Sequence, residues 1–122
     1  MTEQYKSIDL KAFVPSKDYD ESKAFYRDVG FSIASDSQGV AFVHDGACSF
    51  LLQYFYVKEL AENLVMHFQV ENVDAWHKRR VDNGISEKYS IQISEPTDQP
   101  WQMRDFTFHD PSGVLWRVGQ NV

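Results

Sequence analysis

The sequence predicts an α+β fold built from two β-α-β-β-β modules within a single domain, residues 1–122. A helix start and a helix stop occur twice with the same spacing, since Gly30 follows Asp18 by 12 residues and Gly84 follows Asn72 by 12 residues. An apolar strand pattern precedes each helix, and short strand patterns follow it. A repeat of caps, stops and strands at a fixed offset indicates two copies of one structural unit.

The first module is expected over about residues 8–55. Residues 10–16 (LKAFVPS) have a strand pattern that ends in proline, and Asp18 then caps a helix, with Glu21 at the capping-box spacing. Gly30 supplies the left-handed stop. Three short strands follow, at 31–35, 40–44 and 49–53.

The second module is expected over about residues 63–120. Residues 64–70 (LVMHFQV) form its first strand, and Asn72 and Gly84 bound its helix. A longer connection at 94–102 separates the first two of its later strands, which are expected at 89–93, 105–109 and 114–118.

Alternation along the strands separates an apolar face from a mixed one. Leu10, Ala12 and Val14 are expected against the helices, as are the matching residues of the other strands. The opposite face combines polar and apolar side chains, which is typical of a small-molecule cleft. Its members are Lys11, Phe13, Gln53, Val65, His67, Thr107 and Arg117.

Charge and hydropathy exclude several classes of protein. The net charge is −6, with 18 acidic and 12 basic residues, so a nucleic-acid partner is not expected. The short KRR run at 78–80 and the neighbouring His77 are expected on a solvated helix face, and Cys48 is expected to be a buried apolar thiol. No apolar run reaches the roughly 20 residues of a membrane span, and the polar start MTEQYKSIDL predicts a cytoplasmic protein with no membrane partner.

Three segments resemble the vicinal oxygen chelate superfamily, which includes glyoxalase I, extradiol dioxygenases, fosfomycin resistance enzymes and bleomycin resistance proteins. They are residues 18–31 (DYDESKAFYRDVGF), 67–76 (HFQVENVDAW) and 99–120 (QPWQMRDFTFHDPSGVLWRVGQ). The last segment most resembles the bleomycin resistance branch. The resemblance implies curled mixed sheets around a cleft, a homodimer and, in this branch, often an exchanged N-terminal strand.

The resemblance also implies where a metal would bind. Metal-dependent members take ligands from the first and last strand of each module, and these positions correspond here to Lys11, Leu51 (or Gln53), Val65 and Arg117. Divalent ions of such sites need imidazole nitrogen or carboxylate oxygen, whereas lysine and arginine offer positive charge without a lone pair. We therefore expect no metal and no other cofactor.

Other catalytic patterns are weak. The FHDPSG run at 108–113 has the residues of a hairpin turn, so His109 and Asp110 are expected to form its corner. Asp105 near Arg117 or His67 leaves acid–base chemistry open, but a structural ion pair is the preferred interpretation. Trp101 follows Pro100 in a polar loop, where it either stacks on a ligand or packs in the core or at a dimer contact.

Together these residues predict a metal-free binding protein of the bleomycin resistance type that sequesters an antibiotic or an amphipathic metabolite. Basic side chains in the cleft suit a neutral or anionic ligand better than a cationic one. The alternatives are a lyase or isomerase of glyoxalase type with shifted catalytic residues, and a structural dimer with a vestigial cleft. The expected ligand contacts are Lys11, Phe13, Leu51, Gln53, His67, Trp101, Asp105, Thr107 and Arg117.

Overall fold

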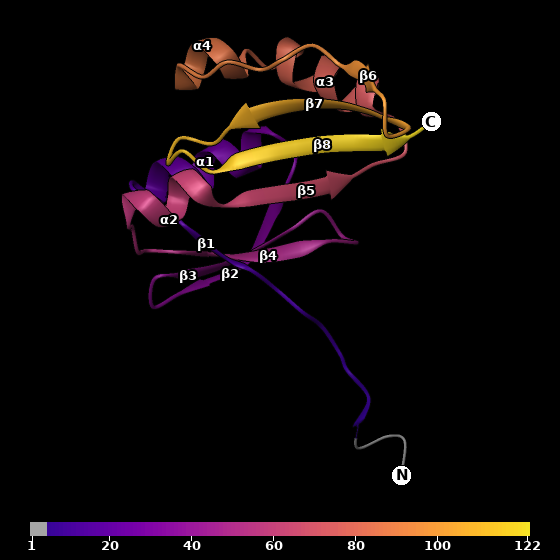
Figure 1. Cartoon of the computed structure of the whole chain (residues 1–122). Coiled ribbons are helices and arrows are strands. Elements are labelled where there is room, and N and C mark those ends of the chain that lie inside the picture. The colour runs from indigo at the N-terminus through magenta and orange to yellow at the C-terminus, as the bar shows by residue number, and fades with distance from the viewer. Residues whose placement is uncertain (1–4) are drawn as a thin grey trace.

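The computed structural model describes residues 5–122 and confirms the predicted fold class, with two four-stranded sheets and a β-α-β-β-β order in each half (Figure 1). The elements of the first half are β1 (Phe13–Pro15), α1 (Tyr19–Asp28), β2 (Ser32–Ser37), β3 (Val40–His44) and β4 (Ser49–Gln53). A short helix, α2 (Lys58–Asn63), leads to the second half. Its elements are β5 (Val65–Gln69), α3 (Val73–Asp82), α4 (Ile85–Tyr89), β6 (Thr97–Gln99), β7 (Met103–His109) and β8 (Leu115–Asn121).

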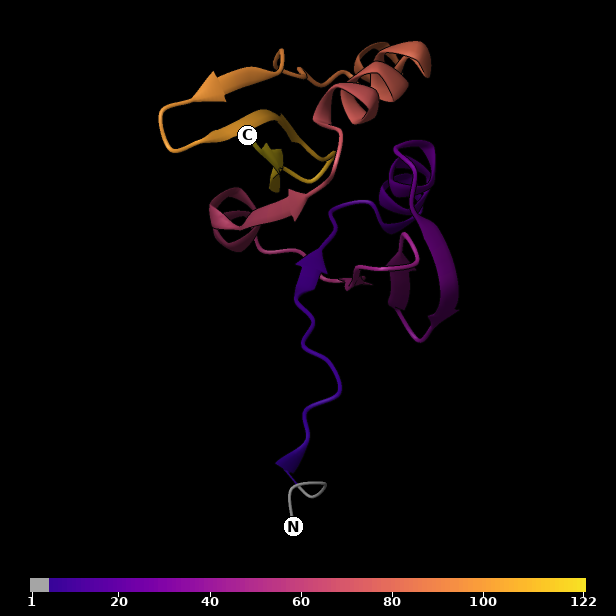
Figure 2. The same ribbon diagram turned by 90° about the vertical axis from the view of Figure 1, so that its right-hand side faces the viewer.

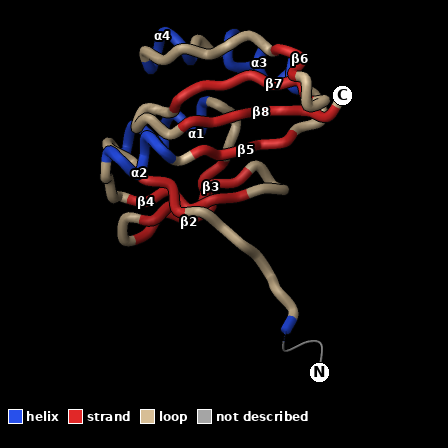
Figure 3. The backbone as a smooth tube through the Cα atoms, in the orientation of Figure 1, coloured by secondary structure: helices blue, strands red, loops and turns tan. Residues whose placement is uncertain are grey.

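The two sheets have the same strand order. The first runs β1-β4-β3-β2 and the second β5-β8-β7-β6, and in each the first strand pairs in parallel with the last strand of its module. The second sheet lies to the upper left and the first to the lower right in Figure 2, and Figure 3 shows α3 and α4 above β7, with α2 at the left beside β5. The internal repeat seen in the sequence is therefore a repeat of topology.

Side chains cap both long helices as predicted. The Asp18 carboxylate accepts from the backbone N–H of Glu21 at 3.1 Å, and the Asn72 side chain accepts from the N–H of Ala75 at 3.0 Å. Each bond satisfies one of the free N–H groups of a first helical turn. Gly30 has a φ of +118°, a conformation that glycine adopts at little cost.

An aromatic core joins the two modules. The Tyr26 ring on α1 lies 5.0 Å from Phe50 of the first sheet and 5.7 Å from Trp116 of the second, measured between ring centroids. Phe25 meets Phe108 and Tyr89 in the same way. Aromatic rings at these separations bury much apolar area, so α1 holds the two modules together.

The first strand is shorter than predicted. It begins at Phe13 rather than at residue 10, and Leu10, which we expected in the core, is 95% exposed. Ala12 is exposed as well. The partner strand β4 begins at Ser49, so the chain before Lys11 has no strand to pair with, and it runs away from the body (Figure 1).

Residues 89–93 do not form the predicted strand. Helix α4 ends at Tyr89, Ser90 takes a left-handed φ of +55°, and the following segment makes a single bridge from Ile93 to Phe108. The regular pairing with β7 is made later, by β6, within the segment that we expected to be a loop. The positive φ at a non-glycine residue interrupts the extended pattern that the alternating side chains suggested.

Three side chains differ in exposure from the prediction. Cys48 is exposed in the β3–β4 hairpin instead of buried. Arg80 is 1% exposed, although the KRR run suggested a solvated face, and His77 is largely covered, with its ring edge-on to Phe106. Helix α3 places Arg80 and His77 against the aromatic residues of β7 in the second sheet. The composition of the segment does not indicate this packing.

No helix within residues 5–122 is long and apolar enough to cross a membrane.

Candidate ligand-binding faces

The first sheet presents one mixed face away from the core. Phe13 on β1 lies opposite Leu51 on β4, and Gln53 follows on the same side of β4, while Val14 and Leu52 between them are fully buried. Phe13 is 52% exposed. We call the residues Lys11, Phe13, Leu51 and Gln53 the first face.

Lys11 stands at the end of this face, just before β1. Its ammonium pairs with the carboxylate of Asp9 and lies 5.0 Å from the centroid of the Phe42 ring. The ring is a favourable neighbour for a cation, and the carboxylate offsets its charge. Because Asp9 offsets the charge of Lys11, the first face is largely apolar and close to neutral.

The second sheet presents a more polar face. His67 on β5 and Thr107 on β7 both lie opposite Arg117 on β8, so these three residues form a row across the sheet. Asp105 precedes Thr107 by two residues and points to the same side. We call His67, Asp105, Thr107 and Arg117 the second face.

Asp105 and Arg117 form the structural ion pair that the sequence favoured. Nη1 of Arg117 donates to Oδ2 of Asp105 at 2.8 Å, and the Gln99 amide donates to the other carboxylate oxygen at 3.0 Å. Asp105 is 2% exposed, whereas 34% of the Arg117 side chain is accessible. The buried carboxylate thus holds a guanidinium whose outer side remains available.

Gly119 makes room beside this pair. A Cβ atom at this position would lie 2.9 Å from the terminal methyl of Met103 and 3.5 Å from Nε2 of His67. Because Gly119 has no side chain, the side chains of Met103 and His67 can occupy the space above β8 at this position. Sequence reasoning missed this glycine, because its role depends on neighbours from two other strands.

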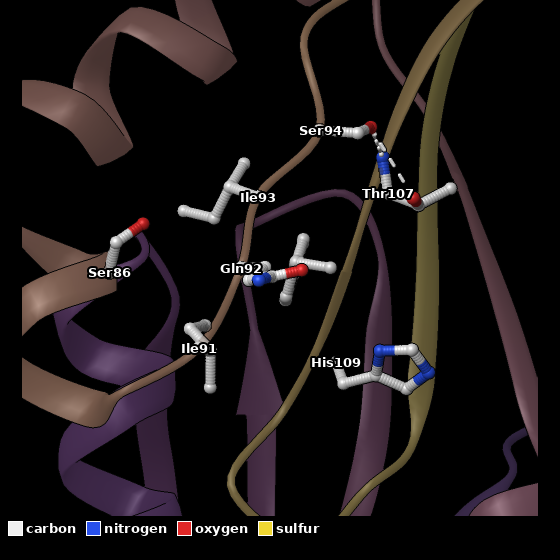
Figure 4. Close-up of a pocket in the computed structure, with 8 residues that line it drawn as sticks. Ser86, Ile91, Gln92, Ile93, Ser94, Thr107 and His109 are labelled. Atoms are coloured by element: carbon white, nitrogen blue, oxygen red, sulfur yellow. Dashed lines mark hydrogen bonds between the residues drawn. The ribbon is translucent and has the colours of Figure 1, made fainter.

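Thr107 lies at the edge of a cavity of about 500 Å³ between β7 and the segment after α4 (Figure 4). The Thr107 backbone N–H donates to Oγ of Ser94 at 2.8 Å. Part of its wall is the segment around Ile93, which was expected to be a strand and makes a single bridge to Phe108. Its lining residues are Ser86, Ile91, Gln92, Ile93, Ser94, Thr107, Phe108 and His109.

A second cavity, of about 360 Å³, lies between the two modules; we call it the seam cavity. His67 connects it with the second face. Its other lining residues are mostly aromatic or sulfur-containing, namely Phe31, Cys48, Ser49, Phe50, Met66, Phe68, Gln69 and Trp116.

The predicted contact residues thus divide into two sets on different sheets. The two cavities include His67 and Thr107, and neither includes a residue of the first face. Trp101 stands apart, 56% exposed in the turn between β6 and β7, so it does not pack in the core of this chain. That all nine residues contact one ligand stays a prediction.

The FHDPSG segment is the predicted hairpin turn. The Asp110 backbone N–H donates to the carbonyl of Val114, and that of Gly113 donates to the carbonyl of Asp110. The Asp110 side chain points into the core, away from both faces, and is 2% exposed. His109 is exposed beside it and lines the cavity next to β7.

Side chains that could hold a metal do not gather on these faces. Within residues 5–122, no three His, Cys, Asp or Glu side chains are close enough together to form a cation site. Val65, at one position implied by the resemblance, starts β5 opposite Leu115 and is 55% exposed. The register partner of this position is thus a hydrocarbon side chain and not a metal ligand.

This architecture defines a two-module protein whose sheets each expose a mixed face. The chain belongs to the glyoxalase/bleomycin resistance protein/dioxygenase superfamily, whose family model matches residues 10–118. The resemblance read from the sequence is therefore confirmed at the level of the superfamily. A search of curated proteins gives no match.

Several solved structures share the fold. The bleomycin resistance determinant encoded on the transposon Tn5 superposes with a TM-score of 0.80 at 24% identity, over 94% of this chain and 98% of the other. A bleomycin-binding protein complexed with bleomycin gives 0.81 at 24% identity, over 95% and 100%. TnmS3, an antibiotic binding protein from Streptomyces sp. CB03234, gives 0.77 at 24% identity, over 96% and 99%.

Proposed function

We propose that this protein is a metal-free small-molecule-binding protein that sequesters an antibiotic or another amphipathic metabolite. One observation carries the proposal: Lys11, Leu51, Val65 and Arg117 stand where the resemblance implies metal ligands, and none of these side chains coordinates a divalent ion at neutral pH. Gln53, the alternative to Leu51, offers an amide oxygen but has no second ligand in this set. The resemblance implies where metal-dependent members of the superfamily hold their ion. At those positions this chain lacks metal-binding side chains.

The two faces support a binding role. On the first sheet, the exposed Phe13 and the partly exposed Leu51 share a side with Gln53, and on the second the exposed Val65 shares a side with Arg117. Binding sites for small molecules typically combine apolar walls with a small number of such groups. The similar solved structures include a bleomycin-binding protein complexed with bleomycin and an antibiotic binding protein, which fits this class.

We assign the ligand contacts to both faces and to Trp101. Because the faces lie on different sheets, one groove that contains both needs a second copy of the chain, with the first face of one copy against the second face of the other. A flat aromatic side chain such as Trp101 at the rim of that groove would stack on a planar ligand.

The N-terminal arm supports a homodimer. Tyr5, Ile8 and Leu10 are 84%, 97% and 95% exposed on a segment that leaves the body of the chain (Figure 1). Apolar residues exposed together in this way mark a contact with another chain. In the proposed dimer the arm lies on the partner copy, in keeping with the strand exchange that the resemblance implies.

The dimer is tested by light scattering after size exclusion. Replacing both Ile8 and Leu10 with serine should shift the protein toward monomer, because the arm then loses its apolar contacts. Val81→Ser is the matched control, since Val81 is an exposed apolar residue on α3, away from the arm. A wild-type protein that is monomeric at micromolar concentration would contradict the dimer.

The binding function is tested by thermal shift with purified, chelator-treated protein and a panel that includes metal-free bleomycin. A ligand that binds only the folded state raises the melting temperature by mass action. Phe13→Asp should abolish the shift, whereas Tyr54→Asp, at an exposed aromatic outside the first face, should not. Turnover of a glyoxalase-type substrate that depends on about one tightly bound divalent ion per chain would overturn the proposal in favour of an enzyme.

A further inference from the structure

We infer that the ligand of this protein is an aromatic anion, whose negative group is held by Arg117 and His67 and whose ring occupies the seam cavity. The inference rests on the proposed function, because it names the chemical class that the same site binds. It depends on three features: an oriented guanidinium, an imidazole directly beside it, and an aromatic cavity that shares the imidazole.

Arg117 is held so that its charge faces outward. Its Nη1 donates to Asp105 at 2.8 Å, and Asp105 is buried under it, with its second oxygen already bonded to Gln99 at 3.0 Å. The pair is neutral as a whole, but its positive end is the accessible one. A guanidinium has five N–H donors in a fixed planar fork, so the outer donors match a carboxylate or sulfonate that binds with two oxygens.

His67 stands beside this fork. It is the register partner of Arg117 on the neighbouring parallel strand, and its exposed side chain makes no hydrogen bond to any residue from 5 to 122. Its Nε2 lies 3.5 Å from where Gly119 would carry a Cβ, and the Cβ of Asp105, which pairs with Arg117, lies at the same distance from that point. An imidazole donor in this place would bind the same anionic group.

The same side of the sheet offers a cation no partner. Asp105 is the one carboxylate that β5, β6, β7 and β8 direct to this side, and both of its oxygens are engaged. The neighbours on this side include Val65, Leu115 and Met103, which are apolar. A cationic ligand would meet the outward donors of Arg117, and no free acid would compensate its charge.

The seam cavity supplies the aromatic part of the site. Four aromatic residues line it, Phe31, Phe50, Phe68 and Trp116, and His67 lines it too. Its volume of about 360 Å³ falls within the usual range of ligand cavities, roughly 300 to 1,000 Å³. A ring in this cavity would therefore carry its substituent on the side of His67.

Because the net charge of the protein is −6, a preference for anions must come from side chains at the site itself. At long range an acidic protein repels an anion, so anion binding requires nearby donors rather than the overall field. Added salt screens both effects. We therefore expect the preference for an anionic ligand to depend on Arg117 and His67 and not on the net charge of the protein.

The test compares two fluorescent probes that share one aromatic skeleton. 1-Anilinonaphthalene-8-sulfonate is an anion, and N-phenyl-1-naphthylamine is its neutral counterpart without the sulfonate. We expect the full-length protein to bind the sulfonate about tenfold or more tightly than the amine, since hydrogen bonds to a charged group are stronger than those between neutral groups.

Variants assign the preference to the proposed groups. His67→Gln should weaken sulfonate binding severalfold and leave the amine unchanged. Arg117→Gln is combined with Asp105→Asn so that no buried carboxylate is left unpaired, and the double variant should abolish the preference. Lys78→Gln, which removes an exposed positive charge on α3, is the matched control and should change neither affinity. Near-UV circular dichroism checks that each variant keeps the native packing.

Different results would contradict the anion assignment and the binding function. If the amine binds as tightly as the sulfonate, or if the variants leave the sulfonate affinity unchanged, the anion assignment is wrong and a neutral or cationic ligand takes its place in the proposed function. If neither probe binds and metal-free bleomycin gives no thermal shift, both the assignment and the binding function are overturned.

Discussion

The hydroxyl of Tyr26 on α1 donates a hydrogen bond to Oδ2 of Asp110, 2.5 Å away in the core. The indole N–H of Trp116 donates to the Tyr26 oxygen at 3.0 Å, and the other Asp110 oxygen accepts from the backbone N–H groups of Ser112 and Val114. The aspartate of the FHDPSG turn is thus both a turn residue and the polar anchor between the two modules.

Removal of the Tyr26 hydroxyl should destabilise the protein. Tyr26→Phe leaves a buried carboxylate oxygen and a buried indole N–H without their partner, and such losses cost about 1 to 3 kcal/mol each. We expect a drop of that order in the free energy of unfolding in urea. Tyr89→Phe serves as control, since the Tyr89 hydroxyl bonds to the partly exposed Asp28 and its loss should cost less.

The stability contributed by Asp110 should fall as the pH rises. Burial raises the pKa of this carboxyl above its ordinary value of 3.8, although hydrogen bonds from Tyr26 and the turn N–H groups oppose the shift. A raised pKa in the folded state means that the folded protein holds the proton more tightly than the unfolded one. The contribution is therefore complete below pH 3.8 and is lost as the pH rises through the folded pKa.

Asp110→Asn tests this sign, because asparagine does not titrate. The advantage of the wild type over the variant in urea unfolding should shrink between about pH 3.5 and pH 7. An advantage that grows over the same interval would mean that the hydrogen bonds outweigh burial and lower the pKa.

Asp28 should behave in the opposite way. Hydrogen bonds from Lys88 and Tyr89 lower the pKa of this carboxyl, and they join α1 to α4 across the modules. A lowered pKa contributes stability that is present above 3.8 and is lost as the pH falls through the folded pKa. Asp28→Asn should therefore be less stable than the wild type at pH 7 and approach it in acid; a constant difference from pH 7 to pH 3 would contradict the ion pair.

Arg80 should be replaceable by a hydrophobic residue. Its guanidinium is buried over the Phe108 ring at 4.9 Å, and among residues 5–122 its Nε has no hydrogen-bond partner. Burial lowers its pKa to about 9, with Arg79 adding to the effect. Replacing buried charge by a well-packed apolar side chain is often neutral or stabilising by about 1 to 4 kcal/mol, so Arg80→Met should unfold at equal or higher urea concentration.

The control for that substitution is Arg80→Ala, which removes the charge but leaves a cavity. It should destabilise the protein by about 2 to 5 kcal/mol, the usual range for truncating a large buried side chain. If Met and Ala variants lose stability equally, the cation–aromatic contacts of Arg80, and not its volume, stabilise the core.

Local signals in the sequence predicted much of the fold. The caps at Asp18 and Asn72, the stop at Gly30 and the FHDPSG turn act through neighbours within a few residues, so a single sequence reveals them. Strand alternation also placed Asp105, Thr107 and Arg117 on one side of the second sheet. The repeat of caps, stops and strands predicted the two modules, and the resemblance added the expectation of curled sheets around a cleft.

The remaining features depend on partners distant in the sequence. Leu10 is exposed because β4 offers no strand for the chain before Lys11, and Arg80 is buried because α3 turns it under Phe106 and Phe108. The seam cavity joins residues of β4, β5 and β8 with Phe31. The periodicity of a single segment cannot predict contacts between residues of different strands.

The most direct test of the account is the equilibrium affinity of 1-anilinonaphthalene-8-sulfonate for the protein before and after removal of divalent ions by a chelator. If metal-free binding is right, the affinity is the same in both states and falls when His67, which lines the seam cavity, is replaced by glutamine. An affinity that disappears with the chelator and returns with a stoichiometric divalent ion would contradict the account, because the site would then depend on a cation that its residues are proposed not to bind.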